Sequence, residues 1–190
     1  MLDQILQSDS ELFLYLNGLG TTTWDGFWMF YTDKVHWIPF YLVLVFLMYK
    51  KRNDKRFIIT VVVIGLMVLF TDQVTNLFKK GFARPRPCHE DEIFQAMRLV
   101  KSWCGGKYGY FSGHASNSMA VAIFSGLMLR YKYKYLIWFL IIWALGMAYS
   151  RVYIGVHYPL DIASGMLFGG LSGLLFYKLE KYFQNRFKLQ

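Results

Sequence analysis

The stretch SRVYIGVHYPLD, residues 150–161, places an arginine, a histidine and an aspartate between two strongly apolar segments. Pro159 suits the first turn of a helix, and Asp161 would lie within that turn. From there Asp161 can hold one ring nitrogen of His157, which fixes the tautomer and leaves the other nitrogen free to react. Arg151 adds a permanent cation at the end of the preceding segment. The spacing therefore predicts an oriented imidazole beside a positive charge.

A second stretch whose residue types could bind or react with a substrate is KKGFARPRP, residues 79–87. A residue before proline is disfavoured in the helical region, so Arg84 and Arg86 are expected to be extended. The preceding helix should therefore end near Lys79. A stiff extended segment can aim planar guanidinium donors at an anion.

A third stretch, FSGHAS, places Ser112, Gly113 and His114 directly before an apolar segment. The N-terminus of a helix presents unpaired N–H groups and a partial positive charge. Glycine lets an oxyanion approach the backbone closely, and the Ser112 hydroxyl adds a donor. The stretch predicts an anion-binding helix N-terminus that carries a second imidazole.

Together the three stretches supply the site with three cations, Lys79, Arg86 and Arg151, and with two imidazoles and one carboxylate. Guanidinium groups and backbone amides match the oxygens of phosphate. Two imidazoles provide a nucleophile and a proton donor for phosphoester cleavage without a metal. The residue types do not say which histidine attacks, and the carboxylate four residues after His157 is the only local reason to prefer it. Because the chain has only 4 histidines, a metal site explains the pattern less well, and we expect no metal and no cofactor.

The segments that must position these groups have the composition of membrane helices. Hydrophobic residues make up 55% of the 190 residues and charged residues 17%, and the apolar residues come in blocks. Blocks of roughly 15 to 20 residues match a bilayer core, which argues against a soluble helical bundle. We predict an all-α, polytopic membrane helical bundle that forms a single domain over residues 1–190. It would have an N-terminal interfacial helical segment at 1–33 and about five transmembrane helices, at 36–50, 57–78, 114–131, 135–150 and 160–177.

The net charge of +9 is segregated by loop. Twelve of the 21 Lys and Arg lie in three segments: 50–56, 130–134 and the tail from 178. By the positive-inside rule these segments, and with them the C-terminus, are predicted to face the cytoplasm. The 79–113 loop and the 150–159 connection would then share the extracytoplasmic face. The basic charge therefore indicates membrane topology, and no nucleic-acid partner is predicted.

The only two cysteines, Cys88 and Cys104, both fall in the 79–113 loop. In an oxidising compartment, a disulfide closing this loop would add on the order of 3 kcal/mol. Two free thiols are the alternative, because the sequence does not specify the geometry.

The segment 160–177 carries Gly165, Gly169 and Gly173 at a spacing of four. This small-xxx-small pattern permits close helix contact. We expect it to serve packing within the bundle.

Other polar residues near the motifs have a simpler interpretation. A lone cation at a membrane boundary usually anchors the chain at the interface, and this reading is preferred for Lys80, Arg84, Lys101 and Lys107. His89 is likewise expected to be interfacial. The role of Asp72, inside the second apolar segment, stays open between helix packing and orientation of a site residue.

The three stretches in combination resemble the type 2 phosphatidic acid phosphatase superfamily, in its membrane lipid phosphatase branch. The pattern is Lys, six residues, Arg-Pro; then Ser-Gly-His; then Ser-Arg, five residues, His, three residues, Asp. It covers residues 79–161 in the family's order. Phe111 stands where the family usually has proline; proline has no catalytic atom, so we expect altered loop stiffness and retained activity.

The resemblance implies a role for each matching residue. His157 would be the nucleophile that forms a phosphohistidine, and Asp161 would orient it. His114 would protonate the leaving group and later activate water. The remaining matches would hold the phosphoryl oxygens: Lys79, Arg86, Arg151, Ser112 and the Gly113 amide.

The resemblance also implies a substrate class and a location. Members of this branch hydrolyse lipid phosphates such as undecaprenyl diphosphate, phosphatidylglycerol phosphate, phosphatidic acid or lipid A phosphates, and vanadate or tungstate would inhibit as phosphate mimics. The protein is expected in the membrane bilayer of a bacterial inner membrane, with 79–113 as an outer catalytic loop. The sequence does not determine which lipid is used, whether a mono- or diphosphate is preferred, or the oligomeric state.

Three alternatives remain open at this point. A lipid phosphotransferase would use the same site. A vanadium haloperoxidase would share the pocket, but those relatives resemble soluble proteins. A non-enzymatic transporter or structural membrane protein should line a path through the bilayer with ionisable residues, whereas here they are expected to gather at one end.

Overall fold

The computed structural model describes residues 1–51 and 55–186, so positions 52–54 of the basic 50–56 segment and 187–190 of the tail lie outside the described residues. Within these ranges the regular structure is helical, apart from an isolated bridge between Pro85 and Tyr108. The elements are α1 (Leu2–Gly18), α2 (Thr22–Thr32), η1 (Lys34–Trp37), α3 (Ile38–Lys51), α4 (Lys55–Phe82), η2 (Pro87–His89), α5 (Asp91–Ala96), α6 (Gly113–Leu129), α7 (Leu136–Tyr153) and α8 (Pro159–Arg186).

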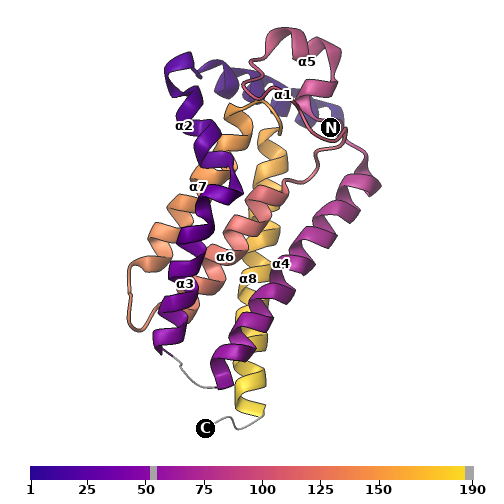
Figure 1. Ribbon diagram of the computed structural model, residues 1–190. Helices are drawn as coiled ribbons and strands as arrows, with labels where there is room; N and C mark the ends of the chain where they lie inside the picture. The colour runs from indigo at the N-terminus through magenta and orange to yellow at the C-terminus, as the bar shows by residue number, and fades with distance from the viewer. Residues whose placement is uncertain (52–54, 187–190) are drawn as a thin grey trace.

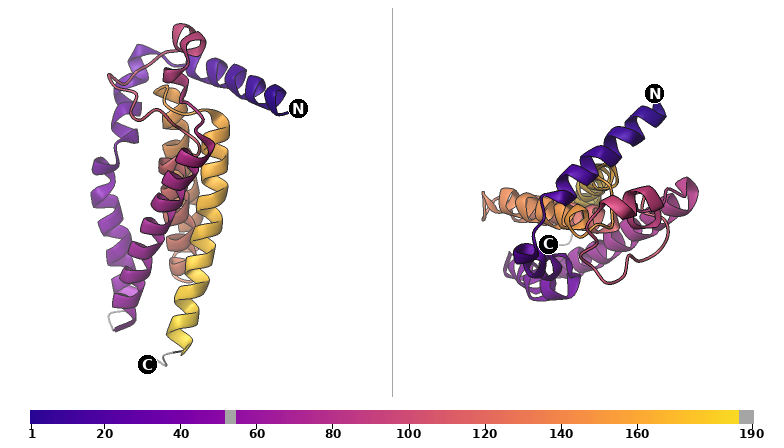
Figure 2. Two further views of the ribbon diagram at one scale, coloured as in Figure 1. Left: turned by 90° about the vertical axis from the view of Figure 1, so that its right-hand side faces the viewer. Right: turned by 90° about the horizontal axis from the view of Figure 1, so that it is seen from above.

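Helix α6 is the centre of a long bundle formed with α3, α4, α7 and α8 (Figures 1 and 2). It packs against all four of these helices, most extensively against α8 and α7. Its buried positions include several alanines, serines and a glycine, which let neighbouring backbones come close. The bundle therefore holds the start of α6 between the helices that carry the other motifs.

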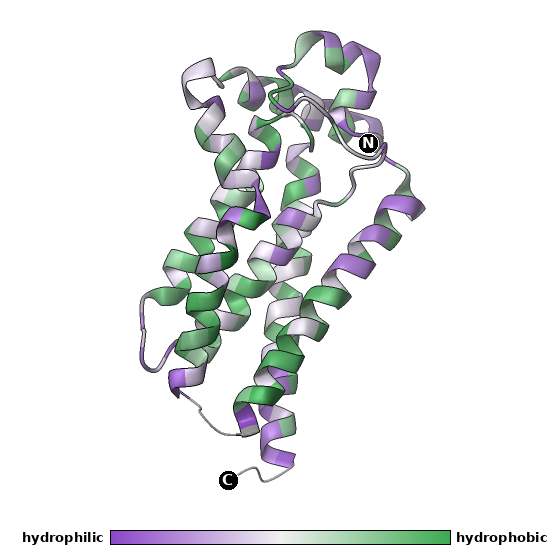
Figure 3. Cartoon of the chain, viewed as in Figure 1, coloured by the Kyte–Doolittle hydropathy of each residue, from purple (hydrophilic) through white to green (hydrophobic). Residues whose placement is uncertain are grey.

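Three described helices are long and apolar enough to cross a membrane: Arg56–Phe82 within α4, Leu136–Tyr153 and Pro159–Arg186. Figure 3 shows hydrophobic residues along the middle of the bundle and hydrophilic residues toward its ends. Many large apolar side chains of α4, among them Ile58, Val62 and Leu66, are exposed, as expected for lipid-facing positions. The structure supports an integral membrane protein of helical class, and the count of five spans stays a prediction.

The glycines of α8 lie at the contact between α8 and α6. A Cβ on Gly165 would lie 2.6 Å from the Ser112 carbonyl oxygen, and a Cβ on Gly173 would lie 2.6 Å from that of Ala120. Such distances are too short for any side chain, so the predicted packing role of this pattern is confirmed. The contact draws the first turn of α8 against the start of α6.

The N-terminal segment forms two helices where one interfacial helix was predicted. Helix α1 lies across one end of the bundle, and α2 packs against α7 (Figure 2). Several large apolar side chains of α1, including Leu2, Ile5 and Leu12, are exposed. Phe13 is fully buried and meets the Tyr158 ring edge-on at 5.3 Å.

The same end of the bundle holds the 79–113 loop and the turn between α7 and α8 (Figure 1). The opposite end holds the described part of the basic segments, where α3 ends and the α6–α7 connection lies. The expected convergence of the motif segments at one end therefore occurs. Two helices run past their predicted ends. Helix α4 continues past Lys79 to Phe82, because the chain leaves the helix only at Ala83, which has a φ of 48°. Helix α8, predicted to end at 177, continues to Arg186.

Candidate active site

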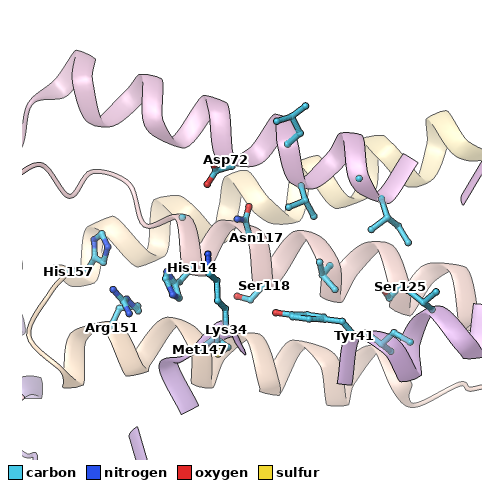
Figure 4. A pocket seen from close by; sticks show the side chains of 18 of the residues that line it. Lys34, Tyr41, Asp72, His114, Asn117, Ser118, Ser125, Met147, Arg151 and His157 are labelled. Atoms are coloured by element: carbon cyan, nitrogen blue, oxygen red, sulfur yellow. The ribbon is translucent and has the colours of Figure 1, made fainter. Parts of the chain in front are cut away.

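A cavity of about 810 Å³ begins between the motif segments and continues down the bundle. One part is lined by polar and charged side chains: Lys34, Asp72, Lys79, Arg86, His114, Asn117, Arg151 and His157. Figure 4 shows Lys34, Asn117, Arg151 and His157 around His114. The other part is lined mainly by apolar residues of α3, α4 and α6: Leu44, Val45, Met48, Ile64, Val68, Leu69 and Val121. The cavity is therefore amphipathic along its length.

His157 lies in the turn between α7 and α8 and is almost fully buried. The turn depends on Gly155, which has a φ of 84° and whose absent Cβ would lie 2.7 Å from the Arg98 carbonyl oxygen. His157 Nδ1 lies 3.2 Å from Asp161 Oδ2, which also accepts a hydrogen bond from the Tyr158 N–H at 3.1 Å. This is the predicted imidazole–carboxylate pair, and it leaves Nε2 of His157 for other contacts.

The electrostatic surroundings of His157 favour the neutral imidazole. Burial lowers the pKa of His157 well below its ordinary value of 6.5, and the nearby cations Arg86, Arg151 and Lys79 lower it further. A neutral imidazole has a lone pair to offer. The site therefore keeps His157 in the form that a nucleophile requires.

Helix α6 begins at Gly113, directly beside this pair. Ser112 is its N-cap and accepts a hydrogen bond from the Ala115 N–H at 3.5 Å, while the Ser112 N–H donates to the Asp161 carbonyl at 3.0 Å. A Cβ on Gly113 would lie 3.8 Å from Lys79 Nζ, so the ammonium lies near the first turn of α6. Ser112 is fully buried behind the cavity wall, and its observed contact is the cap.

Arg86 reaches the cavity from the extended segment after α4. Its φ of −79° and ψ of 158° confirm the predicted extended backbone. Its Nη1 donates to the Cys104 carbonyl at 3.1 Å and its Nε to the Tyr108 carbonyl at 3.3 Å. The loop backbone thereby orients the guanidinium of Arg86, which lines the cavity.

In the structure a disulfide joins Cys88 and Cys104, whose Cα atoms are 6.2 Å apart. It ties the two loop segments that flank Arg86. His89 is exposed beside it, with Nε2 3.3 Å from the Gly105 carbonyl oxygen. Ligand atoms of both cysteines and His89 lie within 4.8 Å of one another, but the disulfide engages both sulfurs.

Arg151 is buried, with 6% of its surface exposed, and borders the cavity from α7. Its Nη1 donates to Thr32 Oγ1 at 2.8 Å, and Ser150 Oγ donates to the same hydroxyl at 3.0 Å. Its Nε has no hydrogen-bond partner among the residues the structure describes. A buried guanidinium with a free donor is suited to bind an anion.

Most of the site residues expected from the sequence line the cavity together: Lys79, Arg86, Gly113, His114, Arg151 and His157. Ser112 and Asp161 lie directly behind them, both fully buried. Two imidazoles, three cations and a helix N-terminus thus surround one space. This arrangement can accept a tetrahedral oxyanion and bring a nucleophile and a proton donor to it.

One sequence interpretation was wrong. Arg84 was assigned to interfacial anchoring, but its side chain is 14% exposed and contacts Asp9 at 2.7 Å and Asp161 at 3.3 Å. The local sequence favoured the anchor because the partner Asp9 is 75 residues away. No signal within the motif could have found this contact.

Sequence reasoning also missed three residues around the cavity. Thr32 supports Arg151, Lys34 borders the cavity beside His114, and Asn117 lies one turn along α6 (Figure 4). Asn117 was detectable in principle, because it lies three residues after His114 and so shares its helix face. Asp72, whose role was left open, lines the cavity and accepts a hydrogen bond from Asn76 at 3.1 Å.

Comparison with known proteins shows the family to which the chain belongs. A family model described as PAP2 superfamily matches residues 60–185. The chain is 35% identical over 179 residues to a Bacteroides thetaiotaomicron protein named lipid A 4'-phosphatase, covering 93% of this chain and 79% of that protein. A Porphyromonas gingivalis protein of the same name is 34% identical over 187 residues, covering 97% and 78% of the two chains. The chain belongs to the PAP2 superfamily, which confirms the family predicted from the motifs.

The fold is also similar to a solved membrane structure. The crystal structure of the first transmembrane PAP2 type phosphatidylglycerolphosphate phosphatase from Bacillus subtilis superposes with a TM-score of 0.74 at 17% identity. The match covers 94% of this chain and 87% of that chain. At this level of identity the likeness concerns the fold alone.

Proposed function

We propose that the protein is a metal-independent membrane lipid phosphatase that works through a phosphohistidine on His157. Membership of the PAP2 superfamily and the names of its relatives support the class of enzyme, a hydrolase of lipid phosphates. The observation that carries the mechanism is that His157 and His114 line the same cavity, with Asp161 Oδ2 3.2 Å from Nδ1 of His157.

The proposed first step transfers the phosphoryl group. His157 Nε2 attacks phosphorus while the bond from phosphorus to the lipid oxygen breaks, and protonated His114 gives its proton to that oxygen. Asp161 stabilises the positive charge that develops on His157. Lys79, Arg86, Arg151 and the start of α6 bind the phosphoryl oxygens as charge builds on them.

The second step restores the enzyme. His114, now neutral, takes a proton from water as the water oxygen attacks phosphorus and the bond from phosphorus to His157 breaks. Inorganic phosphate leaves, His157 is neutral again, and His114 is protonated for the next cycle. Both steps balance without a cofactor.

The substrate that we propose is a phosphate monoester on a lipid A type glycolipid. Two relatives named lipid A 4'-phosphatase align with nearly the whole chain, which supports this choice over undecaprenyl diphosphate, phosphatidylglycerol phosphate and phosphatidic acid. The apolar part of the cavity, with Leu44, Met48 and Val68, is suited to lipid chains. Lys34 and Asp72 add hydrogen-bonding groups between this part and the imidazoles.

The site is proposed to face the extracytoplasmic side, with the C-terminus in the cytoplasm. The basic residues at the far end of the bundle support this orientation through the positive-inside rule. The same segregation argues against a transporter, because the charged cavity residues gather near one end. A lipid phosphotransferase remains the second candidate, and its products distinguish it.

The test is phosphate release by the purified protein from a panel of lipid phosphates in the presence of EDTA. We expect release from the lipid A type monoester above the other lipids, and a covalent phosphoprotein after rapid quenching that is absent in His157→Ala. Activity that EDTA abolishes, or that persists in His157→Ala, would contradict the mechanism. Transfer of phosphate to an added lipid alcohol would favour the phosphotransferase.

A further inference from the structure

Arg84 connects the N-terminal helix α1 to the carboxylate beside His157. Its Nη2 donates to Asp9 Oδ2 at 2.7 Å, and its Nη1 donates to Asp161 Oδ1 at 3.3 Å. The other oxygen of Asp161 lies 3.2 Å from His157 Nδ1. A continuous chain of charged side chains therefore runs from α1 to the imidazole.

Arg84 is held in one place from several directions. Its carbonyl accepts a hydrogen bond from the Gly109 N–H at 2.9 Å. Its guanidinium stacks over the Tyr158 ring at 4.1 Å from the ring centre, and Phe13 of α1 packs against the same ring. A planar guanidinium that is stacked and paired with two carboxylates has little freedom to reorient.

Asp9 contacts two parts of the site at once. Its Oδ2 pairs with Arg84, and its Oδ1 accepts a hydrogen bond from the Leu160 N–H at 2.8 Å. That N–H belongs to the first turn of α8, where backbone donors lack helical partners and a carboxylate is favourable. Burial raises the pKa of Asp9, and its contacts with Arg84 and Leu160 oppose that shift. Asp9 therefore caps the helix that carries Asp161.

We propose that Asp9 and Arg84 are positioning residues that hold the Asp161 carboxylate in the orientation that fixes His157. The inference rests on the proposed function, because it requires His157 to react. With Arg84 in place, Oδ1 of Asp161 is occupied and only Oδ2 faces His157. Without it, the carboxylate can rotate and the imidazole loses its fixed orientation. Helix α1 is then part of the catalytic unit, although it lies outside the range that the family model matches.

The test uses conservative variants and a matched control. Asp9→Asn keeps an oxygen for the Leu160 N–H, and Arg84→Lys keeps the charge but lacks the planar guanidinium whose two nitrogens pair with the two carboxylates. The control is Asp25→Asn, because Asp25 pairs with Arg98 at 3.0 Å and so joins α2 to the same loop without reaching Asp161. We expect kcat to fall about ten- to a hundredfold in both test variants, with KM within about twofold. Asp25→Asn should keep kcat near the wild-type value.

The pH profile supplies a readout that a purely structural defect would not change. Asp9→Asn removes a negative charge, so the pKa of His157 should fall and the acid limb of kcat/KM should move to lower pH. Arg84→Gln removes a positive charge and should move that limb to higher pH. Each shift should be on the order of a few tenths of a pH unit. The charged and titratable groups that act on His157 from the surrounding elements are Lys79, Arg86, Arg151 and His114.

The outcomes separate the two proposals. If the wild type releases no phosphate from any lipid, or His157→Ala stays active, the proposed function fails. If the wild type is active through His157 but Asp9→Asn and Arg84→Lys keep kcat within about twofold, the positioning role is wrong. An equal loss of kcat in Asp25→Asn at similar thermal stability would also overturn it.

Discussion

Two regions of the molecule contribute to the cavity in different ways. The motif region, residues 79–161, supplies the groups proposed to touch the phosphoryl group. The N-terminal region, residues 1–37, supplies mostly supports: Thr32 contacts Arg151 at 2.8 Å and Asp9 contacts Arg84 at 2.7 Å. The reacting groups must have specific side chains at set spacings, whereas a support needs only a donor or acceptor in reach.

Asn17 illustrates how the N-terminal region supports the site. Its Nδ2 lies within hydrogen-bond distance of the carbonyls of Arg98, Val152 and Tyr153, and its Oδ1 accepts from the Arg98 N–H at 2.7 Å. One buried amide thereby joins α1 to the end of α7 and to the outer loop. We infer that the N-terminal region affects the chemistry indirectly, because it holds the backbone and the side chains that contact the proposed reacting groups. Mutations in the two regions should therefore differ in size and kind.

The largest effects should come from the two histidines of the motif region. His157→Ala removes the proposed nucleophile and should lower kcat by about 10⁴-fold or more. His114→Ala removes the proposed proton donor and should cost about 10²- to 10⁴-fold. The measurement is phosphate release from a lipid monoester. The exposed His89→Ala serves as the control, and a comparable loss there would contradict the assignment.

Arg151 and Thr32 contact each other, so substitutions of these two residues allow a direct comparison of the motif region with the N-terminal region. Arg151→Ala should lower kcat/KM by about 10²- to 10³-fold, because it removes a donor to the charged phosphoryl oxygens. Thr32→Val removes only the hydroxyl that accepts hydrogen bonds from Arg151 and Ser150, and it should cost about three- to tenfold. Steady-state kinetics on folded protein measures both. An equal loss in the two variants would show that the distinction between reacting and supporting groups does not hold here.

Lys34 is the exception within the N-terminal region, because it borders the cavity itself. Lys34→Ala should raise KM about two- to tenfold and leave kcat nearly unchanged, since we expect the ammonium to contact the lipid substrate and not the reacting atoms. Lys80→Ala, on the exposed side of α4, is the matched control. A fall in kcat with an unchanged KM would place Lys34 in the chemical step instead.

The smallest effect concerns pH. Burial and three cations of the motif region lower the pKa of His157 below 6.5, so the imidazole should stay neutral in mildly acidic solution. The acid limb of kcat/KM should therefore lie below pH 6.5. Because the unfolded imidazole binds a proton that the folded one does not, the free energy of unfolding should also fall as pH drops below 6.5. An acid limb above pH 6.5 would contradict the neutral His157.

The chemistry of this protein was largely determined by its sequence. The spacings of Lys79, Arg86, His114 and His157 predicted the family, and proline at 159 and glycine at 113 predicted where two helices begin. These features are local, because capping and proline restrictions act within a few residues. The packing role of the α8 glycines was predictable as well, because their spacing of four can be read directly from the sequence.

Only the tertiary structure decided how the site is supported. The contacts of Arg84 with Asp9 and of Arg151 with Thr32 join residues 75 and 119 positions apart, and no local pattern encodes such pairs. The structure also shows that α6 is enclosed by other helices, which explains why it can carry Ser116, Asn117 and Ser118 in its first half. The sequence determines side-chain chemistry and short-range backbone geometry. The distant residues that hold the site side chains in place depend on how the helices pack.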